Sequence, residues 1–181
     1  GGSFNSQRYT VKAGTGLMNN HWTFDGRASK IKSNGYIDRA SSDLDSYYFS
    51  GGYYGAKTMV KAIVFGGQEI TYQSWNGIDQ ETIKINRTFN SAGALYDDNG
   101  VIGYYDNEVD NYRQDHFQLH LTQKLNSYWN ANFSLHYTYG RGYYENYKQG
   151  KAFAELGLDD LVIGDSTITA GDFIIRKWLD N

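Results

Sequence analysis

This 181-residue sequence has four histidines, and three of them lie close enough in the chain to be considered as metal ligands: His116, His120 and His136. All three fall at the polar positions of stretches in which apolar and polar residues alternate. They are therefore expected on the polar faces of two adjacent strands. With a turn at residues 126–128, His120 should lie diagonally across from His136. Three imidazoles can bind a metal ion, but the pattern favours ordinary polar contacts and we assign no metal site.

Five aromatic residues form a second group, in a stretch rich in Asn, Asp and Gly. Aromatic rings among amide and carboxylate side chains make amphipathic contact surfaces for sugars or organic chelates. We therefore predict that this group contacts a substrate. The alternative is that the tryptophan belongs to a ring of interfacial aromatics and that the tyrosines pack the loop. The group comprises Trp75, Tyr96, Tyr104, Tyr105 and Tyr112.

Two further motifs favour plain structural roles. The carboxylates at residues 97–98 and 106–110 lack the fixed spacing of a calcium loop. Gly164-Asp165-Ser166 resembles the start of a hydrolase nucleophile motif, but no oxyanion motif accompanies it, and these residue types favour a turn. We predict neither enzymatic activity nor a cofactor.

Composition narrows the class of protein. The chain has 17 Tyr, 9 Phe and 4 Trp but neither Cys nor Pro, and its formal net charge is −3. This charge provides no basic field for nucleic acid, which we exclude as a partner. No apolar run approaches the roughly 18 residues of a transmembrane helix. The lack of Pro suits a chain of paired strands, because Pro cannot donate a ladder hydrogen bond.

Period-2 alternation is the main structural signal. Phe117, Leu119 and Leu121 alternate with polar residues, and the same rhythm recurs from Phe133 to Tyr139. Each such strand has one apolar, aromatic face and one polar face, as the strands of a transmembrane β-barrel require. The predicted strands cover residues 7–17, 21–32, 46–54, 58–73, 115–125 and 129–139.

The predicted connections are alternately short and long. The longest is a loop at residues 74–114, and residues 140–181 form a loop-like tail. Long loops at one rim and short turns at the other are typical of outer-membrane barrels. We therefore predict an all-β fold: an antiparallel, up-and-down transmembrane β-barrel segment of about six strands with long extracellular loops.

Several segments resemble TonB-dependent outer-membrane receptors of the Bacteroidetes type. They are residues 2–7, 10–17, 25–27, 33–44, 71–77 and 176–181, of which residues 25–44 are the most specific. The family has a 22-stranded barrel with a plugged lumen. The resemblance implies that residues 1–181 are an internal barrel segment without the plug.

This resemblance also implies a function and a location. The chain would be part of an active transporter in the bacterial outer membrane that imports a nutrient such as an iron chelate, energised by TonB through the plug. Its expected partners are outer-membrane lipid, the nutrient, and the remainder of its own barrel and plug.

Two alternatives remain open. One is a complete small outer-membrane barrel of eight strands with a structural or adhesion role, which needs about two more strands from the tail. The other is a soluble, aromatic-rich, carbohydrate-binding β domain, which needs polar residues on the outward faces of its strands.

Overall fold

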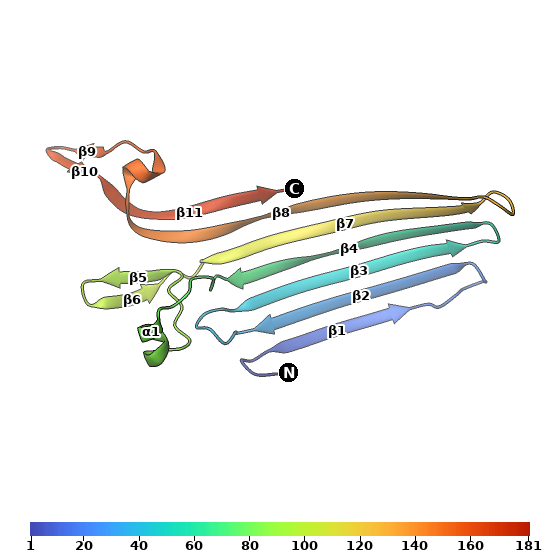
Figure 1. The fold of residues 1–181 in the computed structure, drawn as a ribbon, viewed down its shortest axis with the longest axis horizontal. Helices are drawn as coiled ribbons and strands as arrows, with labels where there is room; N and C mark the ends of the chain where they lie inside the picture. Colours follow the sequence, from blue (N-terminus) through green and yellow to red (C-terminus); the bar gives the residue numbers. More distant parts are fainter.

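The computed structural model describes residues 1–181 and is dominated by one seven-stranded sheet (Figure 1). Each strand is antiparallel to the one before it, in the order β1-β2-β3-β4-β7-β8-β11. This confirms the predicted all-β, antiparallel, up-and-down arrangement. The sheet is open, with β1 and β11 at its edges. The strands are β1 (Gln7–Gly14), β2 (Trp22–Ser33), β3 (Ser42–Tyr54), β4 (Thr58–Tyr72), β7 (Val109–Lys124), β8 (Asn130–Ala152) and β11 (Ala170–Asp180).

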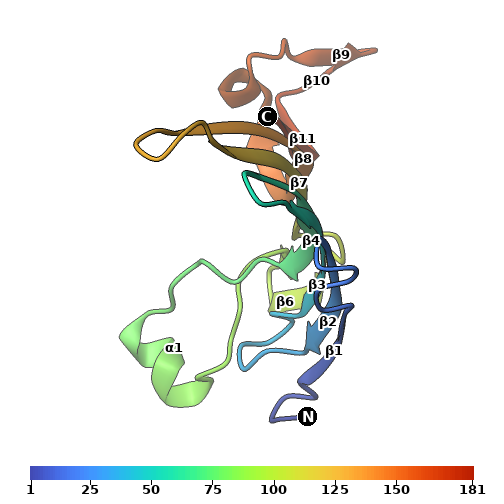
Figure 2. The same cartoon turned by 90° about the vertical axis from the view of Figure 1, so that its right-hand side faces the viewer.

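Smaller elements occupy two of the long connections. Between β4 and β7 lie the helix α1 (Gln80–Ile85) and the hairpin β5 (Ala94–Asp97) with β6 (Gly100–Tyr104). Between β8 and β11 lie the 3₁₀ turn η1 (Phe153–Leu156) and the hairpin β9 (Leu161–Ile163) with β10 (Ser166–Ile168). Neither helical segment has the length and apolar character needed to cross a membrane. Figure 2 shows the segment carrying α1 projecting to one side of the sheet.

The prediction of a loop-like tail at residues 140–181 was wrong. Strand β8 continues to Ala152, and β11 adds a seventh strand to the sheet. Gly140 and Gly142 have no side chains to mark a face, and Tyr143 and Tyr144 place aromatic rings on both faces. The period-2 signal is lost at this point for that reason, although the strand continues.

The predicted boundaries of three other segments also change. Residues 109–114 belong to β7, so the loop predicted at 74–114 is shorter and Tyr112 lies on a strand. Strand β3 begins at Ser42, before the predicted residue 46, and β1 ends at Gly14, before the predicted residue 17.

Short and long connections lie at opposite rims of the sheet, as predicted. Residues 15–21, 55–57 and 125–129 form one rim, while residues 34–41, 73–108 and 153–169 form the other (Figure 1). In the first turn Asn19 and Asn20 both have positive φ, 46° and 57°, which asparagine tolerates. In the third, the side chain of Asn126 accepts hydrogen bonds from the backbone of Tyr128 and Trp129.

The register places large apolar side chains on one face. Phe117 faces Tyr137, Leu119 faces Leu135 and Leu121 faces Phe133, as predicted. Pairing extends these rows across β4, β3 and β2. We call this side the apolar face and its central part the apolar band: Trp22, Phe24, Phe49, Tyr53, Val60, Ala62, Val64, Phe117, Leu119, Leu121, Phe133, Leu135 and Tyr137.

Nothing in the chain covers the apolar band. Phe49 and Phe133 are 53% and 54% exposed, and only 12 of the 181 residues are buried. The sheet is a single layer, and its small buried core of Tyr72, Ala92 and Val109 lies at the rim with the long connections. The opposite side, the polar face, includes Gln118, His120, Ser134 and His136.

Candidate functional site

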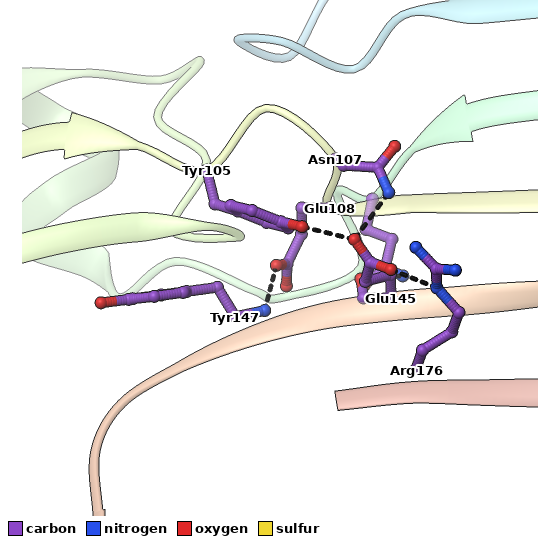
Figure 3. Close-up of polar contacts among 7 residues, drawn as sticks. Tyr105, Asn107, Glu108, Glu145, Tyr147 and Arg176 are labelled. Carbon is purple, nitrogen blue, oxygen red and sulfur yellow. Dashed lines mark hydrogen bonds and ion pairs between the residues drawn. The ribbon is translucent and has the colours of Figure 1, made fainter. Parts of the chain in front are cut away.

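A buried carboxylate organises the rim of long connections. Glu145 of β8 is 1% exposed and accepts hydrogen bonds from the Tyr105 hydroxyl, from Asn107 Nδ2 (2.6 Å) and from Arg176 Nε (Figure 3). Arg176 belongs to β11, whereas Tyr105 and Asn107 belong to the connection between β4 and β7. A buried charge is costly unless it is paired and hydrogen-bonded, and Glu145 meets both conditions.

A second buried carboxylate lies beside the first. Glu108 is 4% exposed and accepts hydrogen bonds from Asn146 Nδ2 (2.9 Å) and from the Tyr147 backbone N–H (2.7 Å). Figure 3 shows the bond from Tyr147. Gln73, at the other end of the same connection, donates its backbone N–H to the Glu108 carbonyl and its Nε2 to the Glu145 carbonyl. Both ends of the connection are therefore fixed to β8.

Arg39 joins two of the long connections. Its guanidinium lies 3.4 Å from the ring centroid of Tyr104 and donates to the carbonyls of Asn90 and Ala92. Asn90 is 1% exposed, and its Nδ2 donates to the carbonyls of Asp38 and Gln73. These contacts anchor residues 90–92 to the β2–β3 connection. The stack of Arg39 on Tyr104 adds a cation–π attraction.

The acidity of Tyr105 reflects its place in this network. Its hydrogen bond to the Glu145 carboxylate, together with burial, raises the pKa of the Tyr105 hydroxyl to about 12. The hydroxyl therefore remains protonated and acts as a fixed donor. Its ring also stacks on Tyr147, with centroids 5.8 Å apart. These contacts suit an anchoring role for Tyr105.

The five aromatic residues predicted to contact substrate have different surroundings. Tyr104 and Tyr105 pack against Arg39 and Tyr147, respectively. Tyr112 points to the polar face, where its hydroxyl occupies the space that a side chain at residue 140 would need. Trp75 and Tyr96 are 61% and 44% exposed. Of the group, these two rings are the most available for binding a solute.

The three histidines lie on the polar face, with His120 diagonal to His136, as predicted. The rings of His116 and His136 are 5.7 Å apart and share Thr138 Oγ1, which is 3.0 Å from His116 Nδ1 and 2.6 Å from His136 Nε2. His120 Nδ1 lies 3.0 Å from Ser134 Oγ. No group of three His, Cys, Asp or Glu side chains is arranged to hold a metal ion.

Sequence reasoning missed the residues that organise this rim: Arg39, Asn90, Asn107, Glu108, Glu145 and Arg176. Their partners are up to 72 residues away in the chain, so no local motif links them. One available signal was the position of Glu145 within a run of tyrosines, where a carboxylate without a partner would be costly to bury.

No protein-family model, curated protein or solved structure matches the chain. The class of protein therefore rests on the architecture itself. It is an all-β protein with a single-layer antiparallel sheet, one apolar face, one polar face and one rim of anchored long connections.

Proposed function

We propose that the sheet forms part of the wall of a transmembrane β-barrel in a bacterial outer membrane. The observation that carries this proposal is the exposed apolar band on an otherwise polar sheet. Large contiguous apolar patches are rare on soluble monomers. In a bilayer such a band would face hydrocarbon. The paired strands meet the other requirement of that environment, because they satisfy their own backbone hydrogen bonds.

The order of side chains along the apolar face also supports strands that cross a membrane. Beyond the apolar band, toward the long connections, come Tyr47 and Tyr139, which face Gly66 and Asp115. Next come charges such as Lys30, which pairs with Asp45, and Arg113, whose partner Asp115 lies in the row of the tyrosines. Apolar, then aromatic, then charged is the order met by a strand that passes from hydrocarbon to the membrane surface.

Within this barrel we propose the role that the sequence resemblance implies, part of a TonB-dependent transporter. The polar face would line the lumen. The long connections would lie outside the cell and contribute to capture of a nutrient such as an iron chelate. The open edges β1 and β11 would pair with further strands, since exposed edges otherwise favour aggregation. TonB would act through the plug, and no reaction would be catalysed.

Cysteine labelling tests the orientation of the wall. The chain has no native cysteine, so Leu119→Cys and Gln118→Cys report on opposite faces at adjacent positions. In outer membranes containing the full parent protein, we expect a membrane-impermeant maleimide to label Gln118→Cys through the lumen and to spare Leu119→Cys. When a membrane-permeant maleimide attaches a fluorescent probe at each position, a lipid-borne quencher should reach only the probe at position 119. Equal labelling and quenching at both positions would rule out the proposed wall.

Uptake tests the transport proposal. Cells that depend on the parent protein for an iron chelate or another nutrient should lose uptake when TonB is removed, although the parent remains in the outer membrane. Unchanged uptake without TonB would reject the transporter and leave the barrel proposal intact.

A further inference from the structure

Three cationic side chains lie together on the polar face without ion-pair partners. Lys12 of β1, Arg27 of β2 and Lys61 of β4 line a shallow depression with Asp25, Tyr48 and Ser50. We call Lys12, Arg27 and Lys61, with Asp25 among them, the cationic patch. It carries three formal positive charges and one negative charge.

The patch is electrostatically unbalanced. Lys12 lies directly opposite Arg27 in the register, and like charges at such positions repel. The protein has seven ion-pair contacts, and none involves Lys12, Asp25, Arg27 or Lys61. The polar-face acids Glu69 and Asp110 pair in register with Tyr112 and Thr71, away from the patch and near the long connections. The sheet therefore does not supply the anion that the patch lacks.

The apolar face provides the contrast. There Lys30 contacts Asp43 and Asp45, Arg113 contacts Asp115, and Arg176 contacts Glu145. Most charges on that face are ion-paired within the sheet, and Arg141, which lies opposite Arg113 and Asp180 in the register, is an exception. Charges of the cationic patch, by comparison, project into the space above the polar face with their donors free.

We infer that the cationic patch binds the carboxylate or phosphate groups of a small anionic solute. The planar guanidinium of Arg27 can bind such a group through two hydrogen bonds, and the lysines add compact point charges. The inference rests on the proposed function in one respect: it takes the polar face as the lumen. It narrows the transported nutrient to a solute that carries anionic groups.

Equilibrium dialysis of the purified, detergent-solubilised parent protein tests the patch, with labelled citrate and labelled inorganic phosphate as separate probes. Saturable binding of citrate alone would identify a carboxylate site, and binding of phosphate alone a phosphate site. Binding should weaken as salt is added. The double variant Lys12→Gln/Arg27→Gln should weaken binding about tenfold or more, because each lost charge-assisted contact is worth about tenfold in affinity.

Two further variants make the test decisive. Lys57→Gln/Lys124→Gln removes the same charge from the short-connection rim, outside the patch, and should leave affinity unchanged. Asp25→Asn removes the only carboxylate and should tighten binding, an effect that misfolding cannot produce. The inference fails if neither probe saturates, if both double variants weaken binding equally, or if Asp25→Asn weakens it. Such a failure would leave the labelling results, and hence the barrel proposal, untouched.

Discussion

Phe117 and Tyr137 lie directly opposite each other on β7 and β8, with ring centroids 6.1 Å apart. Their sequence neighbours Gln118 and His136 form the adjacent pair, on the other face of the sheet. A slip of one residue between the strands would exchange the two faces. The segregation of apolar from polar side chains therefore depends on this register, and adjacent positions offer matched tests of it.

Lysine substitutions at adjacent positions should differ sharply in effect. Leu119→Lys places a charge in the apolar band, which costs about 2–4 kcal/mol near the middle of a bilayer, whereas Gln118→Lys places it on the lumen side. We expect Leu119→Lys to reduce the fraction of folded protein in a lipid-vesicle folding titration, and Gln118→Lys to leave it near wild type. Equal losses for the two variants would contradict the facial assignment.

Replacing Glu145 with Gln should loosen the connection between β4 and β7. The change removes the charge that Arg176, Asn107 and Tyr105 share. Each buried donor left without a partner costs about 1–3 kcal/mol. We expect faster tryptic cleavage after Lys84 and Arg87. Glu155→Gln is the control, because Glu155 pairs only with Lys151 at the surface, and it should not change the cleavage rate.

Alkaline pH should weaken the same network through Tyr105. The folded pKa of about 12 exceeds the ordinary value of 10.0, so between these values the unfolded chain loses a proton that the folded protein retains. The stabilisation is fully present below pH 10.0 and is lost as the pH rises toward 12. Denaturation midpoints measured across this range should fall more steeply for wild type than for Tyr105→Phe. Parallel curves would show that Tyr105 does not titrate in this way.

Only part of the long connection should be dispensable for folding. Deletion of residues 78–87, which carry α1 and no buried residue, should leave the sheet intact, because shortening a surface loop changes its closure entropy by less than about 1 kcal/mol. Deletion of residues 78–108 should fail to fold, since it removes Asn90, Ala92 and Glu108, which are all buried. Heat-modifiable migration in detergent gels measures the folding of both deletion variants. Normal folding of the longer deletion would show that these anchors are unnecessary.

The exposed aromatics should matter more for capture than for stability. Trp75→Ala and Tyr96→Ala remove the two most exposed rings of the predicted substrate group, and we expect weaker nutrient binding by cells with unchanged surface expression. Tyr105→Phe should instead reduce stability, because it removes a donor to Glu145. Full binding by a Trp75→Ala/Tyr96→Ala double variant would exclude both rings from the substrate site.

The sequence by itself determined six of the seven strands of the large sheet and their faces. Alternation at Phe117, Leu119 and Leu121 was sufficient to assign these side chains to one face, because side-chain direction in a strand has period 2, whatever the partner strand. The turn at residues 126–128 then set the pairing, so the diagonal placement of His120 and His136 followed. These properties depend on neighbours close in the chain, which sequence patterns record directly.

Only the tertiary structure decided how the long connections are held. Glu145 receives hydrogen bonds from Tyr105 and Arg176, which lie 40 and 31 residues away in the chain, and no periodicity encodes such distances. The second half of β8 was hidden for a related reason. Gly140 and Gly142 read as breaks in the pattern, yet Tyr112 of the neighbouring strand fills the space above them. The identity of a residue's partner depends on which strands are adjacent, and this becomes defined only when the chain folds.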